Sequence, residues 1–325
     1  MDAFEFIRAE SLSHAAQHRA DAQFVAGGTT LIDLMKLDVF RPKVVVDINP
    51  LPLGQIDASP SGGLILGALA RNSDVANHPV VQRDYAVLSQ ALLSGASPQL
   101  RNMATTGGNL LQRTRCPYFR ETAHACNKRE PGTGCSAIDG HNRMLAILGA
   151  SEHCIATNPS DQNVALTALE ATIQIHGANG VRTVPIHDFY KLPGATPHIE
   201  TALQPGELIT SVTLPPPVAG SKSLYLKLRD RAAYEFALAS AAIVIKLTNN
   251  RIDYARVALG GVGTKPWRSL EAEAILHGAP ADPITFRRAA EAALKNARPQ
   301  SQNGFKVELA RRCIVRALTT ATQTA

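Results

Sequence analysis

The order of apolar and polar positions divides the chain into stretches of different character. In residues 1–54, short runs rich in β-branched and aromatic residues (FEFIRA, QFVAGG and KVVVDI) alternate with the helically spaced apolar positions of TLIDLMKL. Such runs are typical of buried strands, and the second spacing is typical of an amphipathic helix. We therefore expect a small α/β unit in which a glycine pair turns the chain from a strand into a helix.

Residues 55–216 continue as a second α/β part. GLILGAL is predicted to be a strand, residues 71–96 to be helical, and VALTALEATIQIHG to form a helix followed by a strand. Between these elements, at about 112–155, the chain is rich in Cys, Arg, His, Gly and Pro and has no sustained apolar period until MLAILG. A long irregular segment inside a compact domain is uncommon unless it is functional or disordered. We interpret it as an insertion.

The three consecutive prolines of LPPPVAG (214–220) fit neither a helix nor a central strand and indicate a linker. Beyond it, two apolar runs meet at Asn249-Asn250, a sequence that favours a hairpin turn. Helical periods then follow in RSLEAEAILHG, ITFRRAAEAALKNA and FKVELARRCIVRALTTA. The pattern predicts one domain over 1–216 and a second over 221–325.

The composition is that of an ordinary globular protein and excludes some classes of partner. The 325 residues are 45% hydrophobic and 18% charged, and their number suggests two domains. The net charge of +6 is spread along the chain without a Lys/Arg-rich run, so no nucleic acid partner is expected. No apolar run reaches the ~18 residues of a membrane span. The start of the chain has no basic region followed by an apolar one, so we expect no export signal of its own.

Two segments combine threonine with a glycine pair, AGGTTLID (26–33) and ATTGGNLLQ (104–112). Glycines let the backbone approach a ligand closely, and amide and hydroxyl donors can bind phosphate. Each segment alone is better explained as an ordinary turn, but together they could form two sides of a diphosphate clamp, and the pair makes the two interpretations about equal. Neither has the spacing of a P-loop or a Rossmann turn, so a nucleotide site here would be of another type.

Four of the five cysteines fall in the irregular segment: Cys116, Cys126, Cys135 and Cys154. Cys313 stands in an apolar helical context and is expected to be a small buried residue. Structural zinc sites usually contain a closely spaced cysteine pair, which is missing here, whereas widely spaced thiolates can surround an iron–sulfur cluster. The spacing therefore favours a 4Fe–4S cluster over zinc, and zinc over unligated thiols.

The same segment has a surplus of cations that could offset the negative charge of a thiolate-bound cluster. Against four acidic residues stand Arg113, Arg115, Arg120, Lys128, Arg129 and Arg143. Motifs for acid–base or nucleophilic catalysis are not apparent, so no catalytic residue is predicted. Asp161 in NPSDQN and Lys227 in YLKLRD are isolated polar residues beside apolar segments. On local grounds alone, both are expected to be surface or cap residues.

Taken in order, FVAGGTTLIDLMK, LRNMATTGGNL, NPSD and YLKLRDRAAYEFALAS resemble the FAD-binding (medium) subunit of the xanthine dehydrogenase/molybdenum hydroxylase family along nearly the whole chain. Family members usually connect the second glycine loop to the aspartate motif by a short segment, which the cysteine-rich insertion lengthens here. The insertion resembles those that carry a 4Fe–4S cluster in flavin subunits of bacterial periplasmic aldehyde oxidoreductases and of 4-hydroxybenzoyl-CoA reductase. It is more similar to the aldehyde oxidoreductase type.

This resemblance implies an α+β fold with a vanillyl-alcohol-oxidase-type (PCMH) FAD-binding domain in two α/β parts, 1–54 and 55–216, and a C-terminal α+β domain with a small antiparallel sheet. Asp161 would accept hydrogen bonds from the sugar-like chain of the flavin, with Thr157 as a second candidate. Ile209 would pack near the rings, and Lys227 would lie at the pyrimidine edge. The FAD diphosphate and adenosine would be held by Phe24, Val25, Ala26, Gly27, Gly28, Thr29, Thr30, Leu31, Thr105, Gly107, Gly108, Asn109 and Leu110.

The implied function is electron transfer within a heterotrimer. A large molybdopterin-binding subunit would oxidise an aldehyde to its acid, a small subunit with 2Fe–2S clusters would relay electrons, and this chain would pass them through FAD to an external acceptor. Other interpretations are the flavin subunit of a 4-hydroxybenzoyl-CoA reductase or xanthine dehydrogenase, a self-sufficient flavin oxidase, and a zinc-stapled binding protein without redox activity. We expect assembly in the cytoplasm, with export only alongside a partner that bears a twin-arginine signal.

Overall fold

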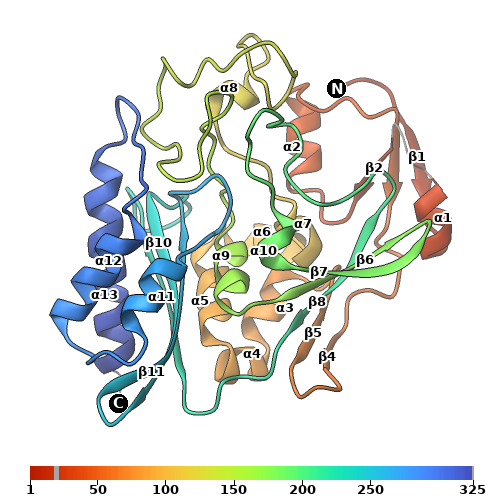
Figure 1. Ribbon diagram of the computed structural model, residues 1–325. Helices are drawn as coiled ribbons and strands as arrows, with labels where there is room; N and C mark the ends of the chain where they lie inside the picture. The colour runs from red at the N-terminus through yellow and green to blue at the C-terminus, as the bar shows by residue number, and fades with distance from the viewer. Residues whose placement is uncertain (18–21, 324–325) are drawn as a thin grey trace.

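The computed structural model describes residues 1–17 and 22–323 (Figure 1). The N-terminal part is the expected small α/β unit, a parallel sheet in the order β1-β3-β2. Its central strand buries Val45 and Val46 almost completely, which explains the continuous apolar run KVVVDI. The elements are β1 (Glu5–Arg8), α1 (Leu12–Gln17), β2 (Ala22–Val25), α2 (Leu31–Lys36) and β3 (Val44–Asp47).

The second part is built on a five-stranded sheet in the order β4-β5-β8-β6-β7, in which neighbouring strands are antiparallel. Its strands are β4 (Ile56–Ala58), β5 (Leu64–Gly67), β6 (Thr172–Gly177), β7 (Gly180–Pro185) and β8 (Leu208–Leu214). The helices are α3 (Asn72–Asn77), α4 (Pro79–Asp84), α5 (Ala86–Ser94), α6 (Pro98–Met103), α7 (Thr106–Leu110), α8 (Pro117–Arg120), α9 (Asp161–Ala168) and α10 (Ile186–Phe189).

The helical stretch predicted over 71–96 is three short helices, α3 to α5. Its first break is at His78, which has extended backbone angles (φ −65°, ψ 128°). Proline disfavours the α conformation in the residue before it, so Pro79 ends α3 and begins α4. The second break is at Tyr85, whose φ and ψ are −131° and 44°.

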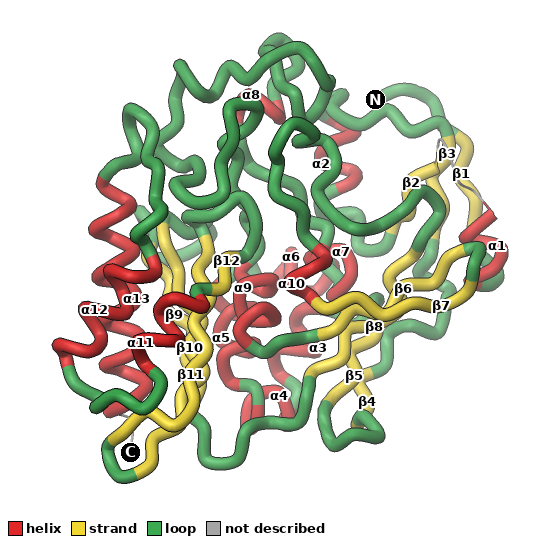
Figure 2. Tube along the Cα trace, viewed as in Figure 1, coloured by secondary structure: helices red, strands yellow, loops and turns green. Residues whose placement is uncertain are grey.

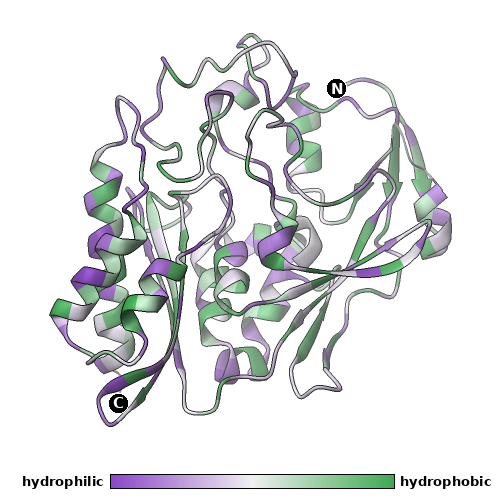
Figure 3. Ribbon diagram, in the orientation of Figure 1, coloured by the Kyte–Doolittle hydropathy of each residue, from purple (hydrophilic) through white to green (hydrophobic). Residues whose placement is uncertain are grey.

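The C-terminal part is a four-stranded antiparallel sheet in the order β12-β11-β10-β9, with helices α11 to α13 packed on it (Figure 1). The expected hairpin is present, because Asn249 and Asn250 turn the chain with φ values of 51° and 59°. The elements are β9 (Lys222–Leu228), β10 (Ala239–Thr248), β11 (Arg251–Gly260), β12 (Trp267–Arg268), α11 (Leu270–Leu276), α12 (Pro283–Ala293) and α13 (Phe305–Gln323). Apolar and polar patches alternate along α12 and α13 (Figure 3).

Strand β10 separates two hydrophobic cores. Ala242 and Val244 belong to the core that contains α5 and α9, whereas Ile243 and Ile245 belong to the core beneath α12 and α13. Both faces of the strand are therefore buried, and this explains why the five consecutive residues 241–245 are all apolar. In α13, Cys313 is buried in the second core, as expected. Among the described residues, no helix is both long and apolar enough to span a membrane.

The cysteine-rich segment, about 112–155, is almost entirely loop, as its sequence predicts (Figure 2). Its only helix among the described residues is the single turn of α8. The segment forms a small core that it shares with Leu34 of α2, and in it Phe119 and Leu145 pack with the cysteines. It lies across one end of the molecule, between α2 and the C-terminal helices (Figure 1).

Candidate functional site

The two Thr/Gly loops, 26–31 and 104–110, lie against each other in the structure. A Cβ atom on Gly27 would lie 1.9 Å from the carbonyl oxygen of Met103, far inside van der Waals contact. Gly107 approaches Ala68 in a similar way, since a Cβ there would lie 3.2 Å from its carbonyl oxygen. The glycine at position 27 is therefore needed for the loops to meet.

Two polar side chains that the sequence did not predict, Asn49 and Arg71, form a brace between the loops. Asn49 follows β3 and donates through Nδ2 to the carbonyl oxygen of Ala26 at 3.0 Å. Arg71 precedes α3 and donates to the carbonyl oxygen of Met103 and, at 3.3 Å, to Oδ1 of Asn49. The only signal in the sequence is a polar residue shortly after a buried strand. Nothing local shows which loop that residue reaches.

The second loop directs several of its amide groups into the fold. The amides of Thr106 and Gly107 donate, at 2.9 and 2.8 Å, to carbonyl oxygens just beyond β5. The amide of Gly108 donates to Oγ1 of Thr105 at 3.2 Å, so this threonine caps α7. Because these donors are already satisfied, they are not available to a phosphate, and the diphosphate clamp expected from the two loops stays a prediction. The first loop is the better source of amide donors.

A cleft of about 330 Å³ opens on one side of the paired loops and a cavity of about 240 Å³ on the other. Small-molecule sites are commonly ~300–1,000 Å³. Both spaces are bordered by Thr29, Thr30, Gly108, Gln112 and Pro159. An elongated ligand could therefore pass across the loops from one space to the other.

Most residues predicted to hold a cofactor border these two spaces. The cleft is lined by Phe24, Ala26, Gly27, Gly28, Thr29, Thr30, Leu31, Thr105, Gly107, Gly108, Leu110, Thr157 and Ile209. The cavity is lined by Thr29, Thr30, Gly108, Asn109, Asp161 and Lys227. Val25 is the exception, because its side chain packs with Met35 and Val45 in a hydrophobic cluster. Ile209 and Lys227 lie in different spaces, so one ligand reaches both only by crossing the loops.

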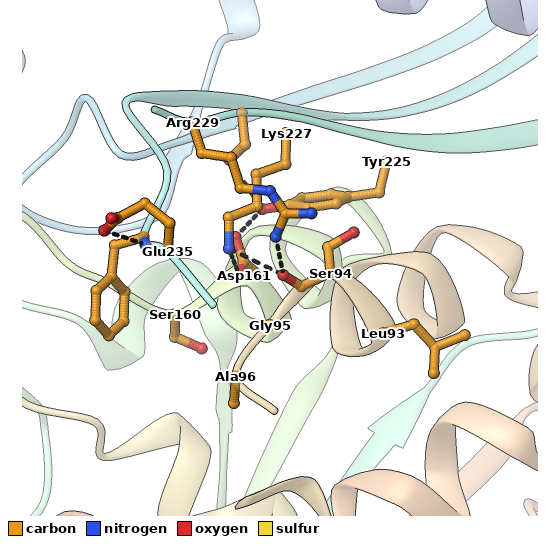
Figure 4. A network of polar contacts seen from close by, with 12 residues as sticks. Leu93, Ser94, Gly95, Ala96, Ser160, Asp161, Tyr225, Lys227, Arg229 and Glu235 are labelled. Atoms are coloured by element: carbon orange, nitrogen blue, oxygen red, sulfur yellow. Dashed lines mark hydrogen bonds and ion pairs between the residues drawn. The ribbon is translucent and has the colours of Figure 1, made fainter. Parts of the chain in front are cut away.

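Asp161 and Lys227 are not surface residues, contrary to the expectation from their local sequence. Nζ of Lys227 lies 2.7 Å from Oδ2 of Asp161 and donates to the carbonyl oxygen of Ser94 at 3.1 Å (Figure 4). The Tyr225 hydroxyl donates to Oδ1 of Asp161 at 2.5 Å. Burial, and then the charge of Asp161, raise the pKa of Tyr225 well above its usual value. The tyrosine therefore remains a neutral hydrogen-bond donor.

The four cysteines of the insertion line one small pocket. Cys116, Cys126 and Cys154 are buried and Cys135 is partly buried, and all four thiols are free. Burial raises the pKa of Cys116 to about 12 and also raises that of Cys154. The pocket volume is about 10 Å³, enough for at most one water molecule, so a cluster would need more room than this pocket provides. In the described part of the chain, no three His, Cys, Asp or Glu residues are grouped so as to hold a metal ion.

The cations of the insertion all have partners, and the expectation that they offset the charge of a cluster stays a prediction. Five of them pair with carboxylates outside the insertion: Arg113, Arg115, Arg120, Lys128 and Arg143. Arg129 donates to the carbonyl oxygens of Tyr118 and Phe119 at 2.7 and 2.9 Å.

Comparison with known proteins shows to which family this chain belongs. Residues 2–217 match the family "FAD binding domain in molybdopterin dehydrogenase", and residues 224–321 match the "CO dehydrogenase flavoprotein C-terminal domain". The chain is 51% identical to the aldehyde oxidoreductase FAD-binding subunit PaoB of Escherichia coli over 99% of both chains. It is 32% identical to the glyceraldehyde dehydrogenase medium chain of Sulfolobus acidocaldarius over 83% of this chain and 79% of that one.

A solved structure has the same fold. Carbon monoxide dehydrogenase from Hydrogenophaga pseudoflava aligns with a TM-score of 0.77 and 26% identity, over 99% of this chain and 98% of the other. The two matched families together cover nearly the whole chain, and the fold is the α+β architecture that the resemblance implied. The chain therefore belongs to the FAD-binding subunits of the molybdenum hydroxylase family, which are oxidoreductase flavoproteins.

Proposed function

We propose that this chain is the FAD-binding electron-transfer subunit of a molybdenum-containing aldehyde oxidoreductase. The observation that carries the proposal is the pair of spaces joined along the Thr/Gly loops, since FAD is an elongated dinucleotide. The proposed domains are 1–216 for FAD binding and 221–325 for the C-terminal part. The first loop would hold the diphosphate, and the cleft would hold the adenosine. Because Ile209 lines this cleft and not the cavity, it would pack beside the adenosine rather than near the flavin rings, as the resemblance implied.

The flavin end would occupy the cavity beside Asp161 and Lys227. Bound FAD supplies the ability to accept electrons and to release them to another carrier. A cation at the flavin stabilises a reduced, anionic form. Lys227 would supply it at the pyrimidine edge, in a cavity that Arg101, Arg115 and Arg231 also line. Asp161 would accept hydrogen bonds from the sugar-like chain, and its pairing with Lys227 fixes the position of both side chains.

We propose that Cys116, Cys126, Cys135 and Cys154 bind a 4Fe–4S cluster. The support is the donor set, because all four thiols line the same pocket and thiolates are the usual cluster ligands. The absence of a closely spaced cysteine pair favours a cluster over zinc. Ligation requires the thiols to lose their protons, so cluster binding would be coupled to proton release and to opening of the pocket.

The names of two relatives support an aldehyde as the substrate of the complex, because one is a subunit of an aldehyde oxidoreductase and the other of a glyceraldehyde dehydrogenase. We propose a heterotrimer with a molybdopterin-binding large subunit and a small subunit carrying 2Fe–2S clusters. Electrons would pass from these partners to this chain and then to an external acceptor. Assembly would take place in the cytoplasm, and export would depend on a twin-arginine signal on a partner.

The test is anaerobic purification of the full chain with its partners, a UV–visible spectrum, and analysis of FAD, iron, sulfide and zinc in one sample. About one FAD, four iron and four sulfide per chain is the expected result. FAD without iron would support the proposed flavin function and refute the proposed cluster. Folded protein without flavin but with one zinc would overturn the proposed function.

A further inference from the structure

Charged side chains of the cysteine-rich insertion form ion pairs with segments on both walls of the cofactor cleft. On one wall, Arg115 and Arg120 pair with Asp33 of α2 at 3.2 and 2.9 Å. Helix α2 directly follows the first Thr/Gly loop. On the other wall, Arg113 and Lys128 both pair with Glu200. Asp33, on the helix whose Leu31 lines the cleft, and Glu200, which lines the cleft itself, are thus each held by two cations of the same insertion.

Glu200 belongs to the segment 191–201, which covers the cleft. Pro197, His198 and Ile199 of this segment line the cleft together with Glu200 itself. The insertion holds the segment at two further points. Nζ of Lys128 donates to the carbonyl oxygen of Pro197 at 3.0 Å, and Ser151 Oγ donates to that of Gly194 at 2.8 Å.

Lys128 lies between the cofactor cleft and the cysteine pocket. It lines both spaces, as do Cys154 and Ala156, so the two spaces share a wall. Its side chain is only 10% exposed, whereas that of Arg143, another paired cation of the insertion, is 49% exposed. Buried charge pairs are costly to break and exposed ones are not. Of the two cations that pair with Glu200, Lys128 is the more buried, since the side chain of Arg113 is 21% exposed, and loss of the Lys128 contact should therefore loosen the covering segment most.

We propose that the insertion is a clamp for the cofactor cleft, with Lys128 as a positioning residue that fixes the segment 191–201 over bound FAD. This inference rests on the proposed function, because it takes FAD to be the occupant of the cleft. The clamp acts through Glu200 and Pro197 and requires no redox role for the insertion. It follows that disturbing the insertion should weaken FAD binding even where the Thr/Gly loops are unchanged.

The test compares Lys128→Met and Glu200→Gln with a matched control, Arg143→Met, which breaks the exposed pair with Asp230. FAD is titrated into each flavin-free full-length chain, and the dissociation constant is measured by flavin fluorescence. Both clamp variants should bind FAD about tenfold more weakly, the double variant little more weakly than either, and the control like the wild type. Glu200→Gln leaves the insertion's sequence intact, so its iron content should match that of the wild type.

Hydrogen exchange of residues 194–201, measured without FAD, separates positioning from direct contact with the cofactor. Exchange should be faster in both clamp variants than in the wild type and unchanged in the control. Wild-type affinity or unchanged exchange in folded clamp variants would overturn the clamp. If Lys128→Met does not fold, Ser151→Ala tests the second contact by the same two measurements. A wild-type chain that binds no FAD would instead refute the proposed function.

Discussion

The carboxylate of Asp161 and the ammonium of Lys227 form a buried ion pair between the two matched regions of the chain, 66 residues apart in sequence. Their side chains are 9% and 3% exposed. Asp161 is the first residue of α9, and Lys227 is in β9. The pair therefore attaches the C-terminal sheet to the FAD-binding region at the edge of the cofactor cavity, so that stability and cofactor position depend on the same contact.

Removing both members of this pair should be less damaging than the two single removals added together. Lys227→Met leaves a buried carboxylate with fewer donors, and Asp161→Asn leaves a buried ammonium without its counter-ion. Each single change is expected to lower the free energy of unfolding by about 3–5 kcal/mol, and the double variant by less than the sum. Urea denaturation of the four proteins measures this cycle. Additive effects would show that the two side chains do not interact.

The Tyr225 hydroxyl should contribute to the same network. Tyr225→Phe removes the donor to Asp161 and the contact with Ser240 at 2.9 Å, but keeps the ring. A hydrogen bond to a charged group contributes about 1.5–3 kcal/mol, so unfolding should become easier by that amount. Tyr254→Phe is the control, since it makes the same change at a half-buried position on β11. Equal effects in the two variants would contradict a specific role for Tyr225.

Gly27→Ala should separate the two Thr/Gly loops. The new methyl group would meet the carbonyl oxygen of Met103 at 1.9 Å, and this neighbour is backbone that cannot rotate away. Overpacking of this kind costs about 1–3 kcal/mol, and FAD affinity should fall because the loops border both cofactor spaces. Gly54→Ala is a matched control, because a Cβ atom at this position would have no neighbouring atom within 4 Å. Thermal melting and FAD titration of both variants test the prediction.

The sequence was sufficient to predict the helices, the strands and the Thr/Gly loops, but not the contacts between distant segments. Periodicity predicted the C-terminal hairpin and helices because those patterns are local. The burial of Asp161 and the Asn49–Arg71 brace depend on which segments the fold brings together. Local sequence made Asp161 look like an exposed cap, and only the family resemblance placed it in the site. The glycine pairs were informative because close backbone approach requires them.

Lys306 joins the insertion to the C-terminal core, and its burial should make stability depend on pH. The side chain is fully buried and donates to the carbonyl oxygens of Met144 and Leu145 at 3.1 and 2.9 Å and of Gly261 at 2.5 Å. Burial, and then the charge of Arg143, lower its pKa to about 7 from an ordinary value of 10.5. Between these values the unfolded chain binds a proton that the folded chain does not, so stability should rise with pH.

The increase in the free energy of unfolding that Lys306 causes is at most about 1.4 kcal/mol per pH unit, the contribution of one proton. Buried thiols act in the opposite direction at higher pH, because burial raises the pKa of Cys313 to about 12 from 9.0. Urea denaturation between pH 7 and about 9 therefore isolates the lysine best. Lys306→Met should remove the rise while retaining the other titrating groups. If the free energy of unfolding changes with pH equally in the wild type and the variant, the three carbonyl oxygens hold Lys306 charged throughout this range.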